Sequence, residues 1–184
     1  DVDLVGKRAS YVISDNTKSG AMAAEYLVRM GHTSIGLIDG SHYVKPAQDR
    51  LTGFHRALED LKVTYNPDWI FRGEFTEEEG YKAMQQILAM DNKPTAIVAQ
   101  DLMAIGAIRA IKDAGLSVPE DFSIVGFDDI ELSWHYDLTT IRQKKEVMGQ
   151  EAGELLLRII RGEVFSPVVV DTEFVERGSC RRLA

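Results

Sequence analysis

The segment from Gly115 to Asp129 constrains the fold of this 184-residue chain more than any other segment. Gly115 has no Cβ and can take the left-handed backbone conformation that ends a helix, and Val118-Pro119 starts a turn. Phe122 to Phe127 then reads as a short strand that is apolar on both faces, which is typical of a buried parallel strand. Asp128-Asp129 follows the strand directly. Ligands of open α/β sheets bind beyond the carboxyl ends of the strands, so this pair is a candidate for a binding site.

Segments with strand and helix periodicity alternate along the rest of the chain. This alternation predicts an α/β fold, with a parallel sheet and helices on both of its faces. A loop is expected over Asp39–Ala47. The strands are expected at Tyr11–Ser14, Ile35–Ile38, Trp69–Phe71, Thr95–Ala99, Phe122–Phe127, Leu138–Ile141 and Val168–Val175. The helices are expected from Asp15 to Gly31, around Leu51–Leu61, from the capping box at Thr76 to Leu88, up to Gly115, and over Val147–Ile160 with Gly162 as its cap.

Composition argues against several classes of function. The formal net charge is −8 and the isoelectric point is about 5.0, so the chain by itself is a poor binder of nucleic acid. Its single cysteine, Cys180, excludes an internal disulfide and a multi-cysteine zinc site. No apolar run approaches the ~20 residues of a membrane span. Phosphate-loop, nucleophile-elbow and zinc-protease motifs are missing, and the histidines lack metal-ligand spacing, so we expect no catalytic residue, metal or cofactor. His32, in a helix-end turn, is expected to act as a cap.

Side chains suited to a small polar molecule stand near the ends of five expected elements. They are Asp15, Arg50, Phe75, Gln100 and Asp128. Carboxylates accept hydrogen bonds from hydroxyl groups, and arginine donates two bonds in a fixed fork. Phenylalanine offers an apolar face, and glutamine both donates and accepts. This mixture favours a neutral polyol or a heterocycle over a phosphate.

Each of these residues also has a purely structural interpretation. Asp15 and Asp101 are equally well explained as helix N-caps, Arg50 as half of a surface ion pair, and Phe75 as a core residue. Asp129 is expected to be a solvated loop charge. The functional interpretation therefore depends on the joint placement of the residues near strand ends.

Seven segments of the chain match one family in order and spacing. Together they resemble the LacI/GalR family of bacterial transcription regulators, over about Tyr11 to Glu176. They are Asp15-Asn16 with Ala24, Leu27 and Gly31-His32; Arg50–Phe54 with Ala57-Leu58; Gly80–Met84; Ala99–Gly106; Val118–Asp129; Leu138–Gln143; and Val175–Arg177.

The resemblance implies a periplasmic-binding-protein-like fold of two Rossmann-like lobes, with the effector between them. It implies effector contacts at Arg50, Phe75, Gln100 and Asp128, with Gln143 near a lobe crossover. Residues 1–31 and 145–163 would form a partial N-terminal lobe, and residues 32–144 and 164–184 a complete C-terminal lobe. Crossovers are expected near Gly31, Lys144 and Val164.

The resemblance further implies the effector-binding and dimerisation portion of a DNA-binding regulator, with no enzymatic activity. Its partners would be a small effector, a second copy that packs on the helix Leu102–Asp113, and operator DNA held by an N-terminal domain absent from this chain. We expect a cytoplasmic protein that does not bind membranes. Val44 and Pro46 stand where a purine-binding relative has polar residues, which favours a sugar or a nucleoside. Two alternatives share the fold: a periplasmic binding protein of a transporter, and an α/β enzyme such as a nucleoside hydrolase or sugar isomerase.

Overall fold

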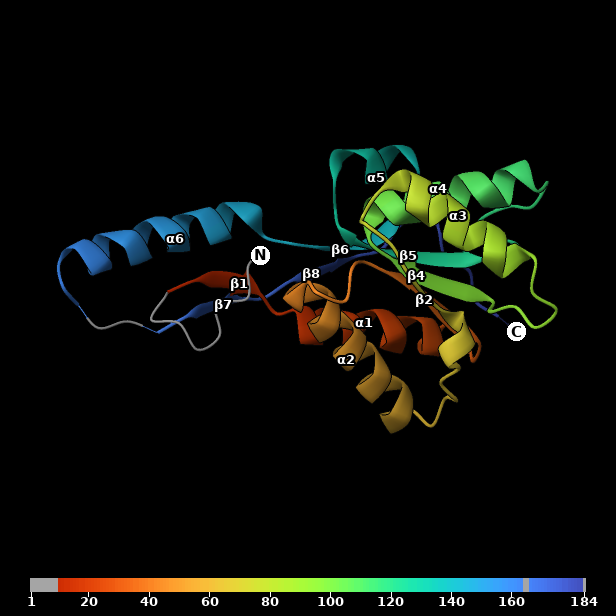
Figure 1. The fold of residues 1–184 in the computed structure, drawn as a ribbon, viewed down its shortest axis with the longest axis horizontal. Coiled ribbons are helices and arrows are strands. Elements are labelled where there is room, and N and C mark those ends of the chain that lie inside the picture. Colours follow the sequence, from red (N-terminus) through yellow and green to blue (C-terminus); the bar gives the residue numbers. More distant parts are fainter. Residues whose placement is uncertain (1–9, 164–165, 184) are drawn as a thin grey trace.

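A computed structural model describes residues 10–163 and 166–183, which form two sheets flanked by helices (Figure 1). Within these residues the larger sheet has six strands in the order β3-β2-β4-β5-β6-β8, and all neighbours are parallel except β6 and β8. The smaller sheet pairs β1 with β7 in parallel. The elements are β1 (Val12–Ser14), α1 (Asn16–Arg29), β2 (Ile35–Asp39), α2 (Lys45–Asp60), a 3-10 turn (Pro67–Trp69), β3 (Ile70–Arg72), α3 (Glu77–Leu88), β4 (Ala96–Ala99), α4 (Asp101–Asp113), β5 (Ser123–Asp128), α5 (Glu131–His135), β6 (Thr139–Arg142), α6 (Lys145–Ile160), β7 (Val168–Val170) and β8 (Glu173–Val175).

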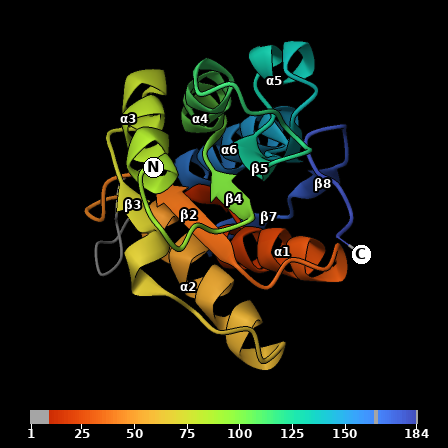
Figure 2. The same ribbon diagram turned by 90° about the vertical axis from the view of Figure 1, so that its right-hand side faces the viewer.

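The larger sheet is buried by a pair of helices on each face. Figure 2 shows α1 and α2 on one side of the sheet and α3 and α4 on the other. Each face has its own apolar cluster, and β4 is completely buried because it contributes side chains to both clusters. The α/β class with mostly parallel strands, predicted from the alternation, is confirmed.

A smaller unit extends to one side of this body (Figure 1). It consists of β1, β7 and α6, and we call it the small unit; the six-stranded sheet with its helices is the large unit. Helix α6 packs on β1 and β7 and leaves much of its apolar surface open, with Leu156, Leu157 and Ile160 at 56%, 54% and 72% exposure. The chain passes between the two units at Ser14–Asp15, at Gln143–Lys144 and at Asp171–Thr172.

Helix α1 belongs to the large unit, which differs from the expected division at residue 31. Its residues Ala23, Ala24 and Leu27 are fully buried in the cluster that also holds Ile35 and Phe54. The crossover expected near Gly31 therefore lies before α1, because apolar burial holds this helix on the larger sheet. Near Lys144 the chain passes from β6 of the large sheet to α6. The crossover expected near Val164 falls outside the described residues.

The end of the chain also departs from the expectation of one strand over Val168–Val175. The structure has two short strands there, β7 in the small sheet and β8 at the edge of the large one. The polar residues Asp171 and Thr172, which separate Val168–Val170 from Phe174-Val175, mark the crossing between the units. Helix α5 was not predicted either, since five residues are too few to show helical periodicity.

Several local signals are confirmed. Thr76 caps α3 by accepting a hydrogen bond from the backbone N–H of Glu79 at 3.3 Å. Gly115 and Gly162 have positive φ angles of 76° and 75° just after α4 and α6. Helix α2 begins at Lys45, inside the expected loop, because Pro46 is well suited to the first turn of a helix.

Helices α1 and α2 approach closely through glycine. A Cβ at Gly53 would lie inside van der Waals contact of the Thr17 carbonyl oxygen, whereas a Cβ at Gly149 of α6 would meet open space. We expect Gly53→Ala to lower the free energy of unfolding of the full-length protein by about 2 kcal/mol, because the two backbones must separate. The control Gly149→Ala should leave it unchanged or raise it by up to ~1 kcal/mol. Urea unfolding measures both, and equal stability of the two variants would contradict this packing.

Candidate functional site

Polar side chains gather where β2, β4, β5 and β6 reach their carboxyl ends. These strands are parallel, so their ends lie at one edge of the sheet, which we call the rim. Asp39 ends β2, Gln100 follows β4, Asp128 ends β5, and Gln143 follows β6. The register pairs Ile38 with Ala99, so Asp39 and Gln100 occupy neighbouring positions at the rim.

The Asp128 carboxylate accepts amide hydrogen bonds from both sides. Gln100 Nε2 donates to Asp128 Oδ2 at 2.7 Å, and Gln143 Nε2 donates to Asp128 Oδ1. The network continues into the small unit, because Ser14 Oγ donates to Gln143 Oε1 at 3.3 Å. Asp128 also has a φ of 105°, a conformation that residues other than glycine seldom adopt. The structure thus brings together Gln100 and Asp128, which were expected from their places at strand ends, and Gln143, which was expected from the family resemblance.

Arg50 points into the same region from α2. It is only 5% exposed, which excludes the surface ion pair considered as its alternative role. Its Nη1 donates to Asn16 Oδ1 at 3.3 Å, and its Cζ lies 5.2 Å from the centre of the Phe127 ring. Arg50, Asn16, Asp128 and Gln143 line one small cavity of about 10 Å³. That volume holds about one water molecule, so a metabolite needs some of these side chains, or the two units, to move.

The other two predicted contacts have different outcomes. The Phe75 side chain is half-buried, and its ring packs against Gly40 immediately after β2, which places Phe75 beside the rim and outside both apolar clusters. Asp15 acts as the N-cap of α1, where its carboxylate accepts a hydrogen bond from the Lys18 backbone N–H at 2.9 Å. Its neighbour Asn16 faces the cavity in its place.

Unpartnered polar atoms concentrate at the rim. Four buried side-chain atoms lack a hydrogen-bond partner in the described part of the chain, and three of them are Asp39 Oδ2, Arg50 Nε and Gln100 Oε1. Buried polar atoms are almost always paired, with protein, water or ligand. Two acceptors and one donor without partners at one rim therefore indicate a place where a polar molecule binds.

Asp39 is the rim residue that the sequence analysis missed. It stands at the end of an apolar strand and was assigned to a polar loop, although it is only 3% exposed. Burial raises the pKa of its carboxyl group to about 6, against the opposing influence of Arg50 and of a hydrogen bond from the Gly40 backbone. The position of Asp39 directly before a glycine and directly after four apolar strand residues is the signal that could have identified it.

A second set of carboxylates holds the loops behind the rim. Asp101 is fully buried and accepts hydrogen bonds from Ile130 N, Ser133 Oγ and Thr140 Oγ1 at 3.0, 2.6 and 2.7 Å. Burial raises its pKa to about 6, although these three donors oppose the rise. Asp101 is thus the anchor of α5 and β6.

Asp129 is not the solvated loop charge that we expected. Its side chain is 5% exposed and forms ion pairs with Arg142 and Arg177, each at 2.7 Å. Burial alone would raise the pKa of Asp129, but the two arginines hold it below the usual value. The expected cap His32 is also buried: Nδ1 lies 2.9 Å from Thr95 Oγ1 and Nε2 lies 3.2 Å from the Arg181 carbonyl oxygen, so it joins two loops.

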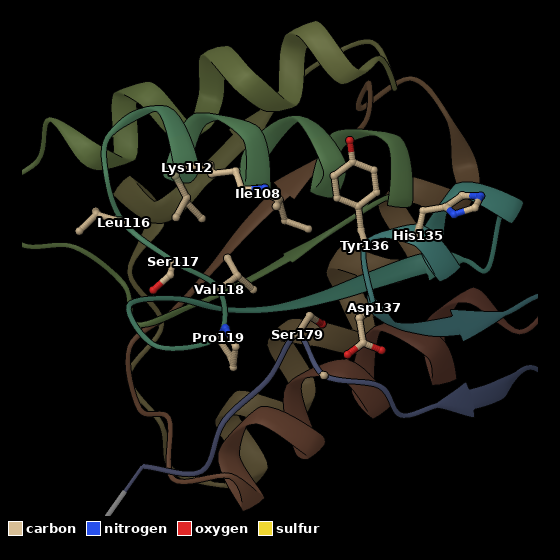
Figure 3. A pocket seen from close by; sticks show the side chains of 12 residues that line it. Ile108, Lys112, Leu116, Ser117, Val118, Pro119, His135, Tyr136, Asp137 and Ser179 are labelled. Carbon is tan, nitrogen blue, oxygen red and sulfur yellow. The ribbon is translucent and has the colours of Figure 1, made fainter.

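A larger hollow, of about 700 Å³, lies away from the rim. Figure 3 shows its wall, which is formed by the end of α4 with Ile108 and Lys112, by the loop 116–119, and by residues 135–137 at the end of α5. None of the predicted site residues lines it. The described residues hold no group of three or more histidine, cysteine, aspartate or glutamate side chains arranged for a metal ion. Among the same residues, no helix is both long and apolar enough to cross a membrane.

The buried Asp39 predicts a pH dependence of stability. Its pKa is about 6 in the folded protein and 3.8 as a free group, so the folded state binds the proton more readily. Its favourable contribution is present below pH 4 and is lost as the pH rises through 6. We expect the unfolding free energy of wild type minus that of Asp39→Asn to fall by about 2 kcal/mol between pH 4 and pH 7. Urea unfolding of the full-length proteins measures this difference, with the exposed Asp91→Asn as control, and a pH-independent difference would contradict the assigned burial.

Comparison with known proteins places this arrangement in a family. Residues 24–180 match the periplasmic binding protein-like domain family. The HTH-type transcriptional repressor PurR of Aliivibrio salmonicida is 42% identical over 153 residues, which cover 82% of this chain and 46% of that protein. PurR of Haemophilus influenzae strain PittEE is 38% identical over 181 residues, which cover 94% of this chain and 54% of that protein. The chain therefore spans about half the length of the curated relatives it matches.

Solved structures of regulators have the same fold. The transcriptional regulator CelR in complex with cellobiose has a TM-score of 0.88 at 34% identity, over 94% of this chain and 54% of that chain. The lac repressor dimer bound to operator and the anti-inducer ONPF has a TM-score of 0.86 at 31% identity, over 92% of this chain and 60% of that chain. The chain belongs to the periplasmic-binding-protein-like family and is an effector-binding region of the LacI/GalR type.

Proposed function

We propose that this chain is the effector-binding portion of a LacI-type transcriptional regulator. It binds a small polar metabolite at the rim, and binding changes the affinity of the full-length protein for operator DNA. The observation that carries the proposal is the cluster of unpartnered polar atoms on Asp39, Arg50 and Gln100 beside the amide-bound Asp128 carboxylate. The likeness to repressors, and to a regulator solved with cellobiose, supports it.

The unpartnered atoms indicate the chemistry of the ligand. Asp39 Oδ2 and Gln100 Oε1 accept hydrogen bonds, whereas Arg50 Nε donates one. A hydroxyl group does both, so a molecule with several hydroxyl groups satisfies all three atoms. An anion offers no donor to Asp39 and adds repulsion from Asp128. Phe75 gives an apolar face beside Gly40 for a sugar ring or a base. A sugar or a nucleoside therefore fits the rim better than a phosphate or a carboxylate does.

The proposal involves binding without bond-making chemistry. The Asp128 carboxylate accepts two amide hydrogen bonds, and the buried Asp101 carboxylate accepts three hydrogen bonds. Both carboxylates are therefore bonded to groups of the protein itself. Asp129 is also unsuited to act with Asp128 as a catalytic acid–base pair, because ion pairs with two arginines neutralise its carboxylate.

Regulation requires a second copy and DNA. Leu132 and Trp134 of α5 and Tyr136 just after it are exposed, at 45%, 69% and 40%. Tyr136 lines a hollow together with Ile108 and Lys112 of α4, the helix assigned to the dimer interface by resemblance. The lac repressor structure, which shares this fold, is a dimer on its operator. In the full-length protein, an effector that binds the two lobe arrangements unequally shifts the balance between them. Such a regulator works in the cytoplasm, where its operator lies.

Replacing one carboxylate tests the site. Asp128→Asn keeps the shape of the side chain and a residue type that tolerates positive φ, but it removes the charge that a ligand hydroxyl would meet. We expect calorimetry on the full-length protein with D-ribose, cellobiose and adenosine to identify a binding probe, and Asp128→Asn to weaken that binding about 50-fold or more. Thermal unfolding confirms that the variant folds.

The control is Asp91→Asn, an exposed carboxylate in the loop before β4 that should bind the probe like the wild type. Unchanged affinity in Asp128→Asn would refute the site. A full-length protein that binds the probe but no DNA fragment from its own promoter would refute the regulatory role and favour a transport component.

A further inference from the structure

Gln143 occupies the point where the chain leaves the large sheet for α6. It follows β6 directly, and Lys144 after it is the N-cap of α6. Its side chain is half-buried and uses both ends of its amide: Nε2 donates to Asp128 Oδ1, and Oε1 accepts from Ser14 Oγ at 3.3 Å. Ser14 is the last residue of β1, so the glutamine connects a strand of the small unit to a strand of the large unit.

Few other side-chain bonds join the two units in the described residues. Lys18 pairs with Asp171 at 2.7 Å on the surface, and Ser19 Oγ lies 2.9 Å from Thr172 Oγ1. Both of these contacts tie α1 to the β7–β8 connection. Asn16 Nδ2 also donates to the Ser14 carbonyl oxygen at 3.0 Å. Asn16, Ser19 and Thr172 line the small cavity, but none of them bonds to Asp128. Gln143 is therefore the side chain that links Ser14 of the small unit to the ligand-facing carboxylate.

The position of the Gln143 amide matters for a ligand. With Gln100 on Oδ2 and Gln143 on Oδ1, both oxygens of Asp128 already accept an amide N–H. The adjoining cavity of about 10 Å³ leaves no room for a sugar ring. Each carboxylate oxygen can accept a second hydrogen bond, so the obstacle to a ligand hydroxyl is space: a side chain that lines the cavity must move before the hydroxyl reaches Asp128. Of the two glutamines, Gln143 is the one whose movement frees space at the junction, because it lines the cavity and Gln100 does not.

We propose that Gln143 is an internal competitor of the effector: its amide holds Asp128 and Ser14 in the free protein, and the effector displaces it. This inference rests on the function proposed above. Displacement replaces a direct bond between the units by one that passes through the ligand. The free and bound proteins then differ in the contact between the small unit and Asp128. A regulatory change of conformation requires such a difference in contacts between the two states.

The competitor role and a simple contact role give opposite results in Gln143→Ala. If Gln143 competes, removing its amide leaves Asp128 Oδ1 open, and the full-length variant binds the probe about fivefold more tightly than the wild type. If Gln143 only contacts the ligand, the variant binds more weakly. Calorimetry with D-ribose, cellobiose and adenosine measures this, and Gln86→Ala, an exposed glutamine of α3, is the matched control. Weaker or unchanged binding would overturn the proposal.

A measurement without ligand tests separately whether Gln143 holds the small unit to the large unit. In the free Gln143→Ala protein, we expect faster amide hydrogen exchange over residues 10–15 and 144–150 than in the wild type and the control. Ser14→Ala, which removes the donor to Gln143 but keeps the bond to Asp128, should speed the same amides and leave probe affinity within about twofold. Saturating probe should reduce the difference between wild type and Gln143→Ala. Unchanged exchange in both variants would overturn the fastening role.

These results also separate the inference from the function on which it rests. Failure of all three probes to bind the wild type, with Asp128→Asn equally inert, counts against the proposed effector site. Binding that depends on Asp128 but weakens in Gln143→Ala leaves the proposed function intact and refutes the competitor role.

Discussion

The hydrogen bonds to the Asp128 carboxylate are the constraint on which the rest of the site depends. Strands β4, β5 and β6 are consecutive in the sheet and parallel, so their carboxyl ends present Gln100, Asp128 and Gln143 side by side. No turn or loop has to be positioned separately for these three side chains to meet. The same geometry makes the rim the junction between the large unit and the small one, because the chain departs for α6 directly after Gln143.

Each of two proposed binding residues at the rim is followed in the chain by a residue that stabilises the fold. Gln100 and Asp128 bond to each other at the rim and are the proposed ligand contacts, whereas the next residue in each case, Asp101 or Asp129, holds the structure behind it. Asp101 fastens α5 and β6 by three hydrogen bonds, and Asp129 is held by two arginines. Gln100 Oε1 can therefore stay without a partner, since the residue after it is fixed by other bonds.

Much of the fold follows from the sequence, because strand burial and helical periodicity are local patterns. The rim could be predicted for the same reason: Gln100 and Asp128 follow apolar strands. Details set by tertiary packing could not. Whether Asp15 or Asn16 faces the cavity depends on the backbone angles of one helix start, and the placement of α1 depends on burial against residues far along the chain. Asp39 was missed because a polar residue after an apolar strand reads equally well as a loop.

The most direct test is a crystal structure of the full-length protein with a sugar or nucleoside that raises its melting temperature. We expect ligand oxygens within hydrogen-bond distance of Asp128 and Arg50, with the Gln143 amide turned away from Asp128. A ligand held instead in the hollow beside α4 and α5, with Asp128 still bonded to both glutamines, would contradict it.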